Sequence, residues 1–263
     1  MAPKRRAPTA LQKKEEDNKK LRSAIDQAAD DFLCPISQEL PVDPVVAEDG
    51  RIYERTEIER HIEQREGSLR SPMTNKPMGK KLLPSAQTRS MIRTLVRTGA
   101  IGGDKAARWE ERLKEEEELQ TWRREAEGGD ADAMLQLGAA HAIGTHGLKA
   151  DFAAACAWFK KGSDLRDVTC MGLAGQCLFD GRGVDEARVH GMSLITQAAG
   201  MGSRDKCYLL AKWYDEGEYD LPKDAAQAKY WFARTADGAI DDINDQYRDN
   251  AAARLQALTA AGE

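Results

Sequence analysis

The chain has 263 residues, of which 41% are hydrophobic and 32% charged, and its net charge is -5. This length allows one or two compact domains, and the apolar content excludes a chain that is disordered throughout. The mildly acidic balance argues against a general nucleic-acid binder, which would need a basic face. No apolar run is long enough to cross a bilayer, and no apolar segment follows the basic residues 1–6, so we expect neither a membrane partner nor a secretory signal.

The five cysteines are scattered along the chain, without a CxxC pair. Their odd number and wide spacing argue against a full disulfide framework. We therefore expect a reducing compartment, with the protein in the cytoplasm. The basic residues Lys4, Arg5 and Arg6 leave a nuclear location open, as an alternative to a solvated tail.

The first 98 residues change character near position 31. Residues 1–30 are predicted to form a tail and a charged helix. Apolar residues at helical spacing give that helix a face that should pack: Leu21, Ile25, Ala28 and Phe32. In residues 31–98, prolines and turn residues separate short apolar runs, which is typical of a small α+β domain.

A long charged helix is predicted for residues 104–127, with Asp104 as its N-cap. Its apolar residues form two separate patches, Trp109 with Leu113 near the start and Leu119 with Trp122 and Ala126 near the end. A helix with two such patches can contact a domain at each end. The acidic run at 115–118 is interpreted as a solvated face rather than a binding site.

Residues 128–237 contain three units that repeat with a period of about 36 residues. Three landmarks keep this register: Leu137-Gly138, Ala174-Gly175 and Leu210-Ala211; then Gly144, Gly181 and Gly217; then Trp158-Phe159, Leu194-Ile195 and Trp231-Phe232. We predict a helix, a glycine-containing loop and a second helix in each unit. One helix pair cannot bury its own apolar face, so the units should stack into a solenoid. Residues 238–263 are expected to form a capping helix and tail, with apolar contacts from Ile243, Tyr247, Ala251 and Leu255.

Residues 31–98 resemble a U-box along their full length. The matching stretches are Phe32-Leu33-Cys34-Pro35-Ile36-Ser37, Asp43-Pro44-Val45-Val46, Gly50-Arg51-Ile52-Tyr53-Glu54-Arg55, Ile58-Glu59-Arg60-His61-Ile62, Ser71-Pro72-Met73-Thr74 and Leu82-Leu83-Pro84-Ser85. The repeats resemble the Sel-1-like branch of tetratricopeptide-type repeats, notably in the loop Gly181-Arg182-Gly183-Val184. The resemblance implies an α+β, RING-like and zinc-free domain, followed by an all-α helical repeat solenoid. A three-stranded sheet and a helix near Glu54–Glu66 are expected in the first domain.

The ligand count supports the absence of zinc independently of the resemblance. Two structural zinc ions would need about eight Cys or His ligands. Within residues 31–98 these types are represented by Cys34 and His61, for which we expect packing and structural roles. We therefore expect no metal and no cofactor, and a polar network in their place around an apolar core. The network is predicted to use Asp43, Glu54, Arg55, Ser71 and Thr74, and the core Leu40, Val45, Ile58, Ile62 and Leu83.

The activity that the resemblance implies is that of a RING-type (U-box) ubiquitin-protein transferase. The reactive thioester belongs to a ubiquitin-conjugating enzyme, so the ligase needs no catalytic nucleophile and contributes proximity and orientation. Ile36 and Pro72, with Gln38 and Met73, match the positions that dock the conjugating enzyme. Asn75 lies at the linchpin position, where some related ligases carry a basic residue that bridges the conjugating enzyme and ubiquitin.

We expect the repeats to bind a protein substrate or an adaptor. The exposed candidates for this contact are Arg166, Arg182, Arg204 and Lys212. Two alternatives stay open: repeats that act only as a spacer, and a non-catalytic adaptor or scaffold whose U-box serves docking or dimerisation. A homodimer is also open, with Leu21 and Ile25 or Trp109 and Leu113 as contacts.

Overall fold

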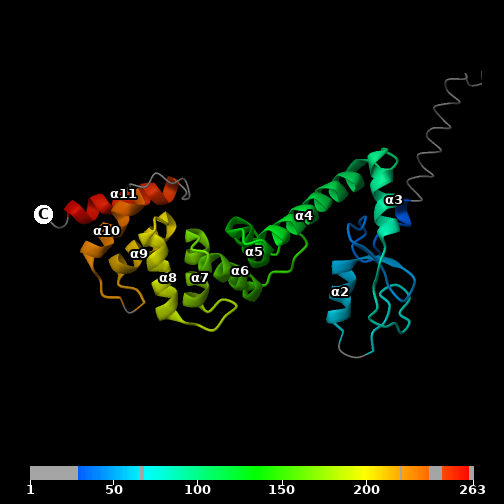
Figure 1. Ribbon diagram of the computed structural model, residues 1–263, viewed down its shortest axis with the longest axis horizontal. Coiled ribbons are helices and arrows are strands. Elements are labelled where there is room, and N and C mark those ends of the chain that lie inside the picture. Colours follow the sequence, from blue (N-terminus) through cyan, green and yellow to red (C-terminus); the bar gives the residue numbers. More distant parts are fainter. Residues whose placement is uncertain (1–28, 66–67, 220, 237–244, 261–263) are drawn as a thin grey trace, which may run out of the picture. The chain divides into compact units, whose positions relative to one another are not determined.

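The computed structural model describes residues 29–65, 68–219, 221–236 and 245–260. The chain divides into two compact units, with the boundary between Glu117 and Glu118 (Figure 1). The predicted contacts of Leu21, Ile25, Ala28 and Ile243 lie outside the described residues. None of the described helices contains a stretch that is both long and apolar enough to cross a membrane.

The first unit is built on a small antiparallel sheet, which together with the helical second unit confirms the predicted fold class. Strands β1 (Pro44–Val46), β2 (Ile52–Glu54) and β3 (Leu83–Pro84) pair in the order β2-β1-β3. Val45 faces Tyr53 on one neighbour and Pro84 on the other. Gly50 turns the chain between β1 and β2 with a φ of 76°, a left-handed conformation that glycine adopts without strain.

Two helices of the first unit follow the strands, and one apolar cluster combines residues of the strands and of the first helix. Helix α2 (Arg55–Glu63) follows β2 directly, and α3 (Ala86–Arg97) follows β3. One cluster contains Cys34, Val45, Ala47, Tyr53 and Ile58, with Ile62 and Leu82 packed against it. The predicted core position of Leu83 is wrong, because its side chain is 53% exposed. Adjacent side chains of a strand point to opposite faces, and here Leu82 takes the inward one.

Helix α4 (Gly103–Glu127) has the two apolar patches that its sequence predicts. Trp109 is buried in the first unit, and Leu113 packs beside it. Leu119 and Ala126 are buried in the second unit. Asp104 lies inside the first turn, so its prediction as N-cap is wrong, although an acidic residue there still favours the helix dipole.

The acidic run of α4 is more than a solvated face. The Glu116 carboxylate lies 2.6 Å from Arg89 Nη2 on α3, and Glu117 lies 3.5 Å from Arg93. Burial raises the pKa of Glu116 although the Arg89 charge opposes the rise. The run therefore attaches α4 to α3 within the first unit.

The second unit is a stack of helix pairs, shown from α5 to α11 in Figure 1. The helices are α5 (Ala131–Ile143), α6 (Phe152–Asp164), α7 (Val168–Asp180), α8 (Arg188–Gly200), α9 (Arg204–Glu216), α10 (Ala225–Ala236) and α11 (Asp245–Ala260). The repeated glycines Gly144, Gly181 and Gly217 each end the first helix of a unit, with φ values of 81°, 64° and 72°. Such a left-handed position at a helix end favours glycine, which explains the period.

Small residues allow the helices of a unit to approach closely. A side chain added at Gly138 would overlap the Phe159 ring, and one added at Gly175 would meet Ile195 Cγ1 at 2.9 Å. Phe159 and Ile195 occupy the same place in successive repeats and are both buried. Sequence register therefore translates directly into helix packing.

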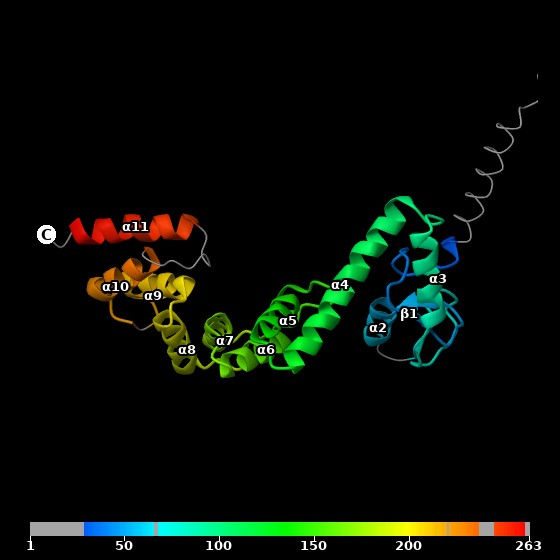
Figure 2. The same cartoon turned by 45° about the horizontal axis from the view of Figure 1, so that its top comes forward.

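Helix α11 packs against α9 and α10 at the end of the stack (Figures 1 and 2). Ala251 is fully buried there, and Leu255 packs beside it. Arg254 donates two hydrogen bonds to the Asp215 carboxylate on α9, at 2.7 and 2.9 Å. The apolar face and this ion pair together attach α11 to the last repeat.

Candidate functional site

Two loops of the first unit have the same sequence pattern and the same backbone hydrogen bonds. Residues 34–39 read Cys-Pro-Ile-Ser-Gln-Glu, and residues 71–76 read Ser-Pro-Met-Thr-Asn-Lys. In the first loop, Cys34 N donates to Glu39 O and Gln38 N donates to Cys34 O, both at 2.8 Å. We call these segments loop 1 and loop 2. The docking residues predicted from sequence all lie on them.

Loop 2 repeats that arrangement residue by residue. Ser71 N donates to Lys76 O at 2.9 Å, and Asn75 N donates to Ser71 O at 3.0 Å. Gln38 and Asn75 occupy equivalent places and share a left-handed backbone, with φ values of 59° and 55°. Each loop is thus a closed turn that presents its third residue, Ile36 or Met73, next to a rigid proline.

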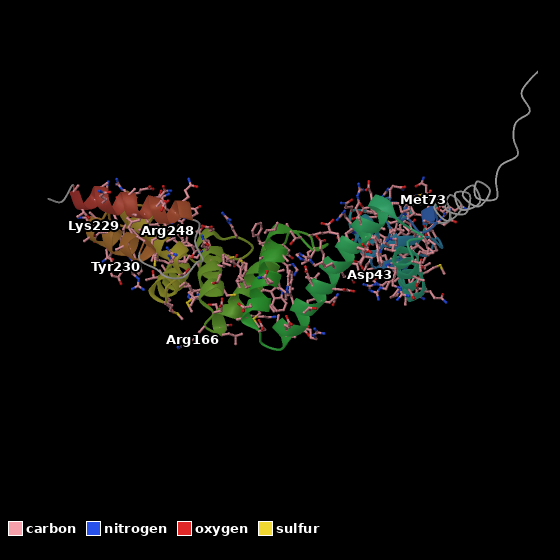
Figure 3. All side chains as sticks on the ribbon, turned by 90° about the horizontal axis from the view of Figure 1, so that it is seen from above. Asp43, Met73, Arg166, Lys229, Tyr230 and Arg248 are labelled. Carbon is pink, nitrogen blue, oxygen red and sulfur yellow. The ribbon has the colours of Figure 1, made fainter. Side chains whose placement is uncertain are left out.

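The predicted docking residues differ in exposure. Ile36 is half-buried and packs against the Cys34 cluster, and Pro72 is also half-buried. The Met73 side chain is 51% exposed, and it is labelled in Figure 3. Gln38 is exposed and donates from Nε2 to Pro35 O at 2.8 Å, which fixes its side chain against loop 1. The loops therefore offer a small surface that is partly apolar and partly polar.

Asn75 has a structural reason for its identity. A left-handed backbone is unfavourable for most residues, and asparagine is enriched there. The backbone carbonyl of Asn75 accepts a hydrogen bond from Arg70 Nη1 at 2.9 Å, and the residue is exposed to solvent. Lys76 beside it is exposed too. Asn75 can hydrogen-bond to a partner but supplies no charge.

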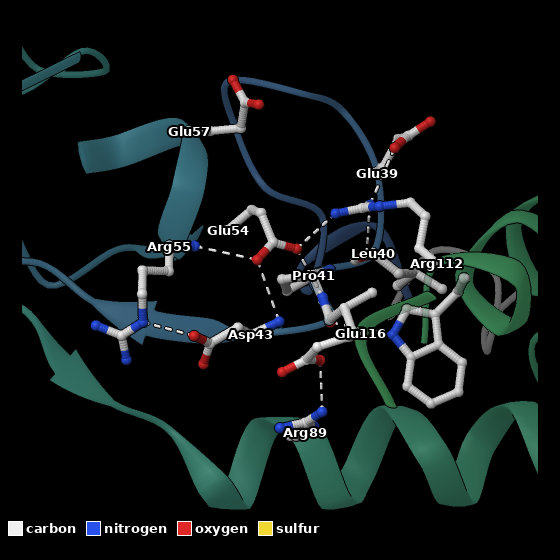
Figure 4. A network of polar contacts seen from close by, with 12 residues as sticks. Glu39, Leu40, Pro41, Asp43, Glu54, Arg55, Glu57, Arg89, Arg112 and Glu116 are labelled. Atoms are coloured by element: carbon white, nitrogen blue, oxygen red, sulfur yellow. Dashed lines mark hydrogen bonds and ion pairs between the residues drawn. The ribbon is translucent and has the colours of Figure 1, made fainter. Parts of the chain in front are cut away.

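A buried carboxylate holds the segment that follows loop 1 (Figure 4). Glu54 is 3% exposed and accepts from Val42 N at 2.7 Å, Asp43 N at 3.1 Å and Arg55 N at 3.2 Å. Arg112 Nη2 on α4 lies 2.6 Å from the same carboxylate. The Arg55 side chain in turn donates to Asp43 at 2.5 Å. Every oxygen of Glu54 is thus used in fixing the chain between loop 1 and β1.

A second carboxylate holds loop 2. Asp49 accepts from Ser71 Oγ at 2.6 Å and from Tyr53 Oη at 2.7 Å. Ser71 Oγ in turn accepts from the backbone of Met73 and Thr74. Burial favours the neutral acid, yet hydrogen bonds from Ser71 and Tyr53 hold the pKa of Asp49 below its ordinary value. Burial, with the neighbouring Asp49 carboxylate, raises the pKa of Tyr53, which stays protonated and donates.

Tyr53 connects the two loops. It is fully buried in the same cluster as Cys34 of loop 1, and it shares the Asp49 carboxylate with Ser71 of loop 2. A third carboxylate, Glu48, accepts from Gly79 N at 2.9 Å and Lys81 N at 3.2 Å. Carboxylates at three places therefore fix loop 2 and the segments that follow each loop.

Most of the predicted polar network is confirmed. Glu54, Asp43, Arg55 and Ser71 take part through their side chains. Thr74 does so through its backbone N–H, while its Oγ1 accepts a long 3.4 Å hydrogen bond from Lys76 N. Among the described residues no group of three or more His, Cys, Asp or Glu side chains is placed to hold a metal ion.

Cys34 and His61 both have structural roles in the first unit. Cys34 is fully buried, as expected for a packing role. His61 lies half-buried on α2, with Nε2 at 2.9 Å from Arg70 O. Trp109, considered as a dimer contact, is 3% exposed within its own unit and is not available to a second copy.

The repeats carry the cations predicted to contact a partner, with one exception. Arg166 and Arg182 are exposed, and Lys212 is half-exposed. The prediction for Arg204 is wrong: it is 4% exposed and donates from Nε and Nη2 to Thr235 O at 3.1 and 3.0 Å. The Thr235 carbonyl near the end of α10 accepts from this buried guanidinium, and sequence spacing gives no sign of the contact.

A cavity of about 490 Å³ opens between α9, the segment before α10, and α11. Its lining combines aromatic rings with cations and anions: Tyr208, Lys212, Asp215, Glu216, Lys223, Phe232, Asn250 and Arg254. Tyr208 contacts Phe232 edge-on, with ring centroids 6.0 Å apart. The Asp215–Arg254 pair is satisfied internally, and Lys212 lies 4.0 Å from the Glu216 carboxylate, which leaves Lys223 as the lining cation outside these ion pairs.

Two family models match the chain in the regions just described. The U-box domain model covers residues 28–99, and the Sel1 repeat model covers residues 131–167, 169–203 and 207–239. The chain therefore contains a U-box domain followed by three Sel1 repeats, which confirms the resemblance seen in its sequence.

Three curated relatives illustrate the likeness. The chain is 43% identical over 81 residues to WD repeat, SAM and U-box domain-containing protein 1 of Gallus gallus, covering 31% of this chain and 17% of that protein. It is 40% identical over 79 residues to U-box domain-containing protein 54 of Arabidopsis thaliana, covering 30% and 25%. It is 43% identical over 63 residues to a protein of Acanthamoeba polyphaga mimivirus named a "Probable bifunctional E2/E3 enzyme", covering 24% and 5%.

The chain thus spans a quarter or less of each of these relatives. Among solved structures, it is similar to a Sel1 repeat protein from Oxalobacter formigenes, with 24% identity and a TM-score of 0.43, covering 53% of this chain and 97% of that one.

Proposed function

We propose that the chain is a ubiquitin-protein ligase whose U-box docks a ubiquitin-conjugating enzyme carrying ubiquitin, and whose Sel1 repeats recruit a substrate or adaptor. The U-box match and the name of the mimivirus relative support the ligase assignment. The structural observation that carries the proposal is the pair of matched loops, each closed by the same backbone hydrogen bonds. Carboxylates hold loop 2 and the segment that follows loop 1.

The chemistry of such a ligase is positional. Ubiquitin moves from the cysteine thioester of the conjugating enzyme to a lysine amine of the substrate, and the ligase forms no covalent intermediate. A docking surface that is already ordered loses little conformational freedom on binding. Loops 1 and 2 meet this requirement because their turns are closed before any partner arrives.

The division of labour among the site residues follows from their exposure. Ile36, Pro72 and Met73 provide the apolar contact, and Gln38 provides a polar one at its edge. Asn75 is placed to hydrogen-bond to ubiquitin or to the conjugating enzyme, without the charge of a basic linchpin. Cys34 supplies no nucleophile, because it is fully buried.

A non-catalytic adaptor is the second candidate, favoured by the uncharged Asn75. Both functions need the docking surface, and they differ in whether the docked thioester becomes more reactive. The test is autoubiquitination by the full chain with a panel of conjugating enzymes. Activity with at least one enzyme supports the ligase, and binding without activity across the panel supports the adaptor.

Matched variants make that assay specific to the loops. Ile36→Ala and Pro72→Ala are expected to reduce ubiquitination about tenfold, the usual effect of losing a contact of about 1.4 kcal/mol. Ile143→Ala and Pro222→Ala change the same residue types at exposed positions of the repeats and should leave the rate unchanged. Equal rates for all four variants would remove the docking assignment.

Substrate recruitment is proposed for the cavity between α9 and α11. Lys223 and the rings of Tyr208 and Phe232 suit a peptide that carries acidic and apolar side chains. On an array of peptides with varied charge, the full chain should select acidic sequences, and Lys223→Glu should abolish that selection. Lys160→Glu, the same change at an exposed position of α6, should preserve it. Indifference of the wild-type chain to peptide charge would contradict the proposal.

A further inference from the structure

Part of helix α4 contacts the segment 39–41 at the end of loop 1. The U-box model ends at residue 99, whereas α4 begins at Gly103. Trp109 and Arg112 nevertheless reach back to residues 39–41, which directly follow loop 1's predicted contacts Ile36 and Gln38. The sequence predicts that this helix contacts a domain at each end, and these polar contacts give it a further role within the first unit.

Trp109 holds this chain through one buried hydrogen bond. Its Nε1–H donates to Pro41 O at 3.0 Å, and both residues are buried. Its ring lies in the apolar cluster that also contains Leu40 and Val42. A buried carbonyl without a donor is unfavourable by about 1–3 kcal/mol, so this bond fixes where the chain passes.

Arg112 holds the same segment at two points and Glu54 at a third (Figure 4). Its Nη1 donates to Glu39 at 3.0 Å and to Leu40 O at 3.3 Å, and its Nη2 donates to Glu54 at 2.6 Å. A planar guanidinium can satisfy a carbonyl and two carboxylates at once, which a lysine ammonium on its flexible stem cannot do in the same geometry. One side chain therefore joins the last residue of loop 1 to the Glu54 carboxylate.

We infer that Trp109 and Arg112 are positioning residues for the conjugating enzyme, so that the docking module extends beyond the U-box to residue 112. Neither residue touches the partner in this scheme. They hold loop 1 in the conformation that presents Ile36 and Gln38, and without them docking must also pay the entropy of ordering the loop. The inference rests on the proposed function of the two loops.

The chain offers a matched control at the contact between α3 and α4. Arg93 of α3 lies 3.5 Å from Glu117 of α4, and both side chains are more than half exposed. This ion pair also attaches α4 to the first unit, through α3 and not through loop 1 or Glu54. If the variants acted only by loosening the attachment of α4, Arg93 and Arg112 variants would both impair docking of the conjugating enzyme. If Arg112 positions loop 1, only the Arg112 variants would impair it.

The experiment measures ubiquitin discharge from the conjugating enzyme against its concentration, with the full chain and the variants Arg112→Ala, Arg112→Lys, Trp109→Phe and Arg93→Ala. Arg112→Ala is expected to raise the KM for the charged enzyme about tenfold and to leave kcat within about twofold, because the loop is ordered again once docking is saturated. Arg112→Lys should recover part of the loss. Trp109→Phe, which keeps the packing and removes the donor, should raise KM by about threefold. Arg93→Ala should match the wild-type chain.

Amide hydrogen exchange of residues 34–42 provides the readout that does not depend on a partner. Faster exchange in Arg112→Ala and Trp109→Phe, with unchanged exchange in α2, is expected. An Arg112→Ala chain with wild-type KM and wild-type exchange overturns the inference. A wild-type chain that discharges no conjugating enzyme defeats the proposed function instead, a result recognisable before any variant is made.

Discussion

Replacing Glu54 by glutamine tests the hydrogen bonds of its carboxylate, which hold the segment between loop 1 and β1 and which we call the clasp. The carboxylate accepts two hydrogen bonds at Oε2, from Val42 N and Arg112, and two at Oε1, from Asp43 N and Arg55 N. A glutamine keeps one oxygen and turns the other into an NH₂ donor, so two of the four donors lose their acceptor in either orientation.

The magnitude follows from the burial of those donors. Each buried donor left without an acceptor destabilises by about 1–3 kcal/mol, and breaking a buried ion pair costs about 3–5 kcal/mol. Glu54 is 4% exposed at its side chain but Arg112 is 29% exposed, so water recovers part of the loss on the arginine side. We therefore expect Glu54→Gln to lower the free energy of unfolding of the first unit by about 3 kcal/mol.

Hydrogen exchange of the full chain separates this effect from the repeats. The amides of Val42 and Asp43 should exchange faster in Glu54→Gln, and the amide of the buried repeat residue Leu137 should be unchanged. Glu57→Gln is the control, because among the described residues Glu57 pairs with Arg60 one turn along α2, and the loss of this partly exposed pair should change stability by less than about 0.5 kcal/mol. A Glu54→Gln effect no larger than that of Glu57→Gln would refute the clasp.

Three further predictions concern packing, pH and metal. Gly138→Ala should destabilise the repeats by about 1–3 kcal/mol in urea unfolding, because the new methyl overlaps Phe159, while Gly200→Ala, with open space at that position, should not; equal midpoints would contradict the packing. The pKa of Asp49 in the folded protein lies below its ordinary value of 3.8, so the ionised carboxylate stabilises the first unit at pH values above 3.8, and this stability is lost as the pH falls through the lowered pKa. Unfolding of the first unit by acid should therefore depend less steeply on pH in Asp49→Asn than in the wild-type chain. Identical profiles would argue against this. A chelator should leave the melting temperature of the first unit unchanged, and a clear fall would show that a metal helps to hold the loops.

Local patterns in the sequence account for much of the fold. The period of Gly144, Gly181 and Gly217 marks helix ends that need a left-handed residue, and this requirement is purely local. The two apolar patches of α4 also follow from spacing alone. Loops 1 and 2 repeat one six-residue pattern from Cys34 and from Ser71 onward, a signal that would have predicted their shared turn.

Contacts between distant charged residues could not be predicted in the same way. Arg112 and Glu54 are 58 positions apart, and the sequence around Arg112 reads as an ordinary charged helix. Asp49 and Glu48 look like turn residues until the fold brings Ser71 and Gly79 to them. Arginine is rarely buried without partners, and one partner of Arg204 is the backbone carbonyl of Thr235, which no residue type reveals.

The most direct measurement of the central claim is single-turnover discharge of ubiquitin from a conjugating enzyme to free lysine, which needs no substrate on the repeats. Met73 of loop 2 and Met91 of α3 have equally exposed side chains, at 51% each, so they form a matched pair within the first unit. Met73→Ala should slow discharge about tenfold at subsaturating conjugating enzyme, and Met91→Ala should leave it at the wild-type rate. Equal discharge by both variants would contradict the claim that the two loops seat the ubiquitin-charged enzyme.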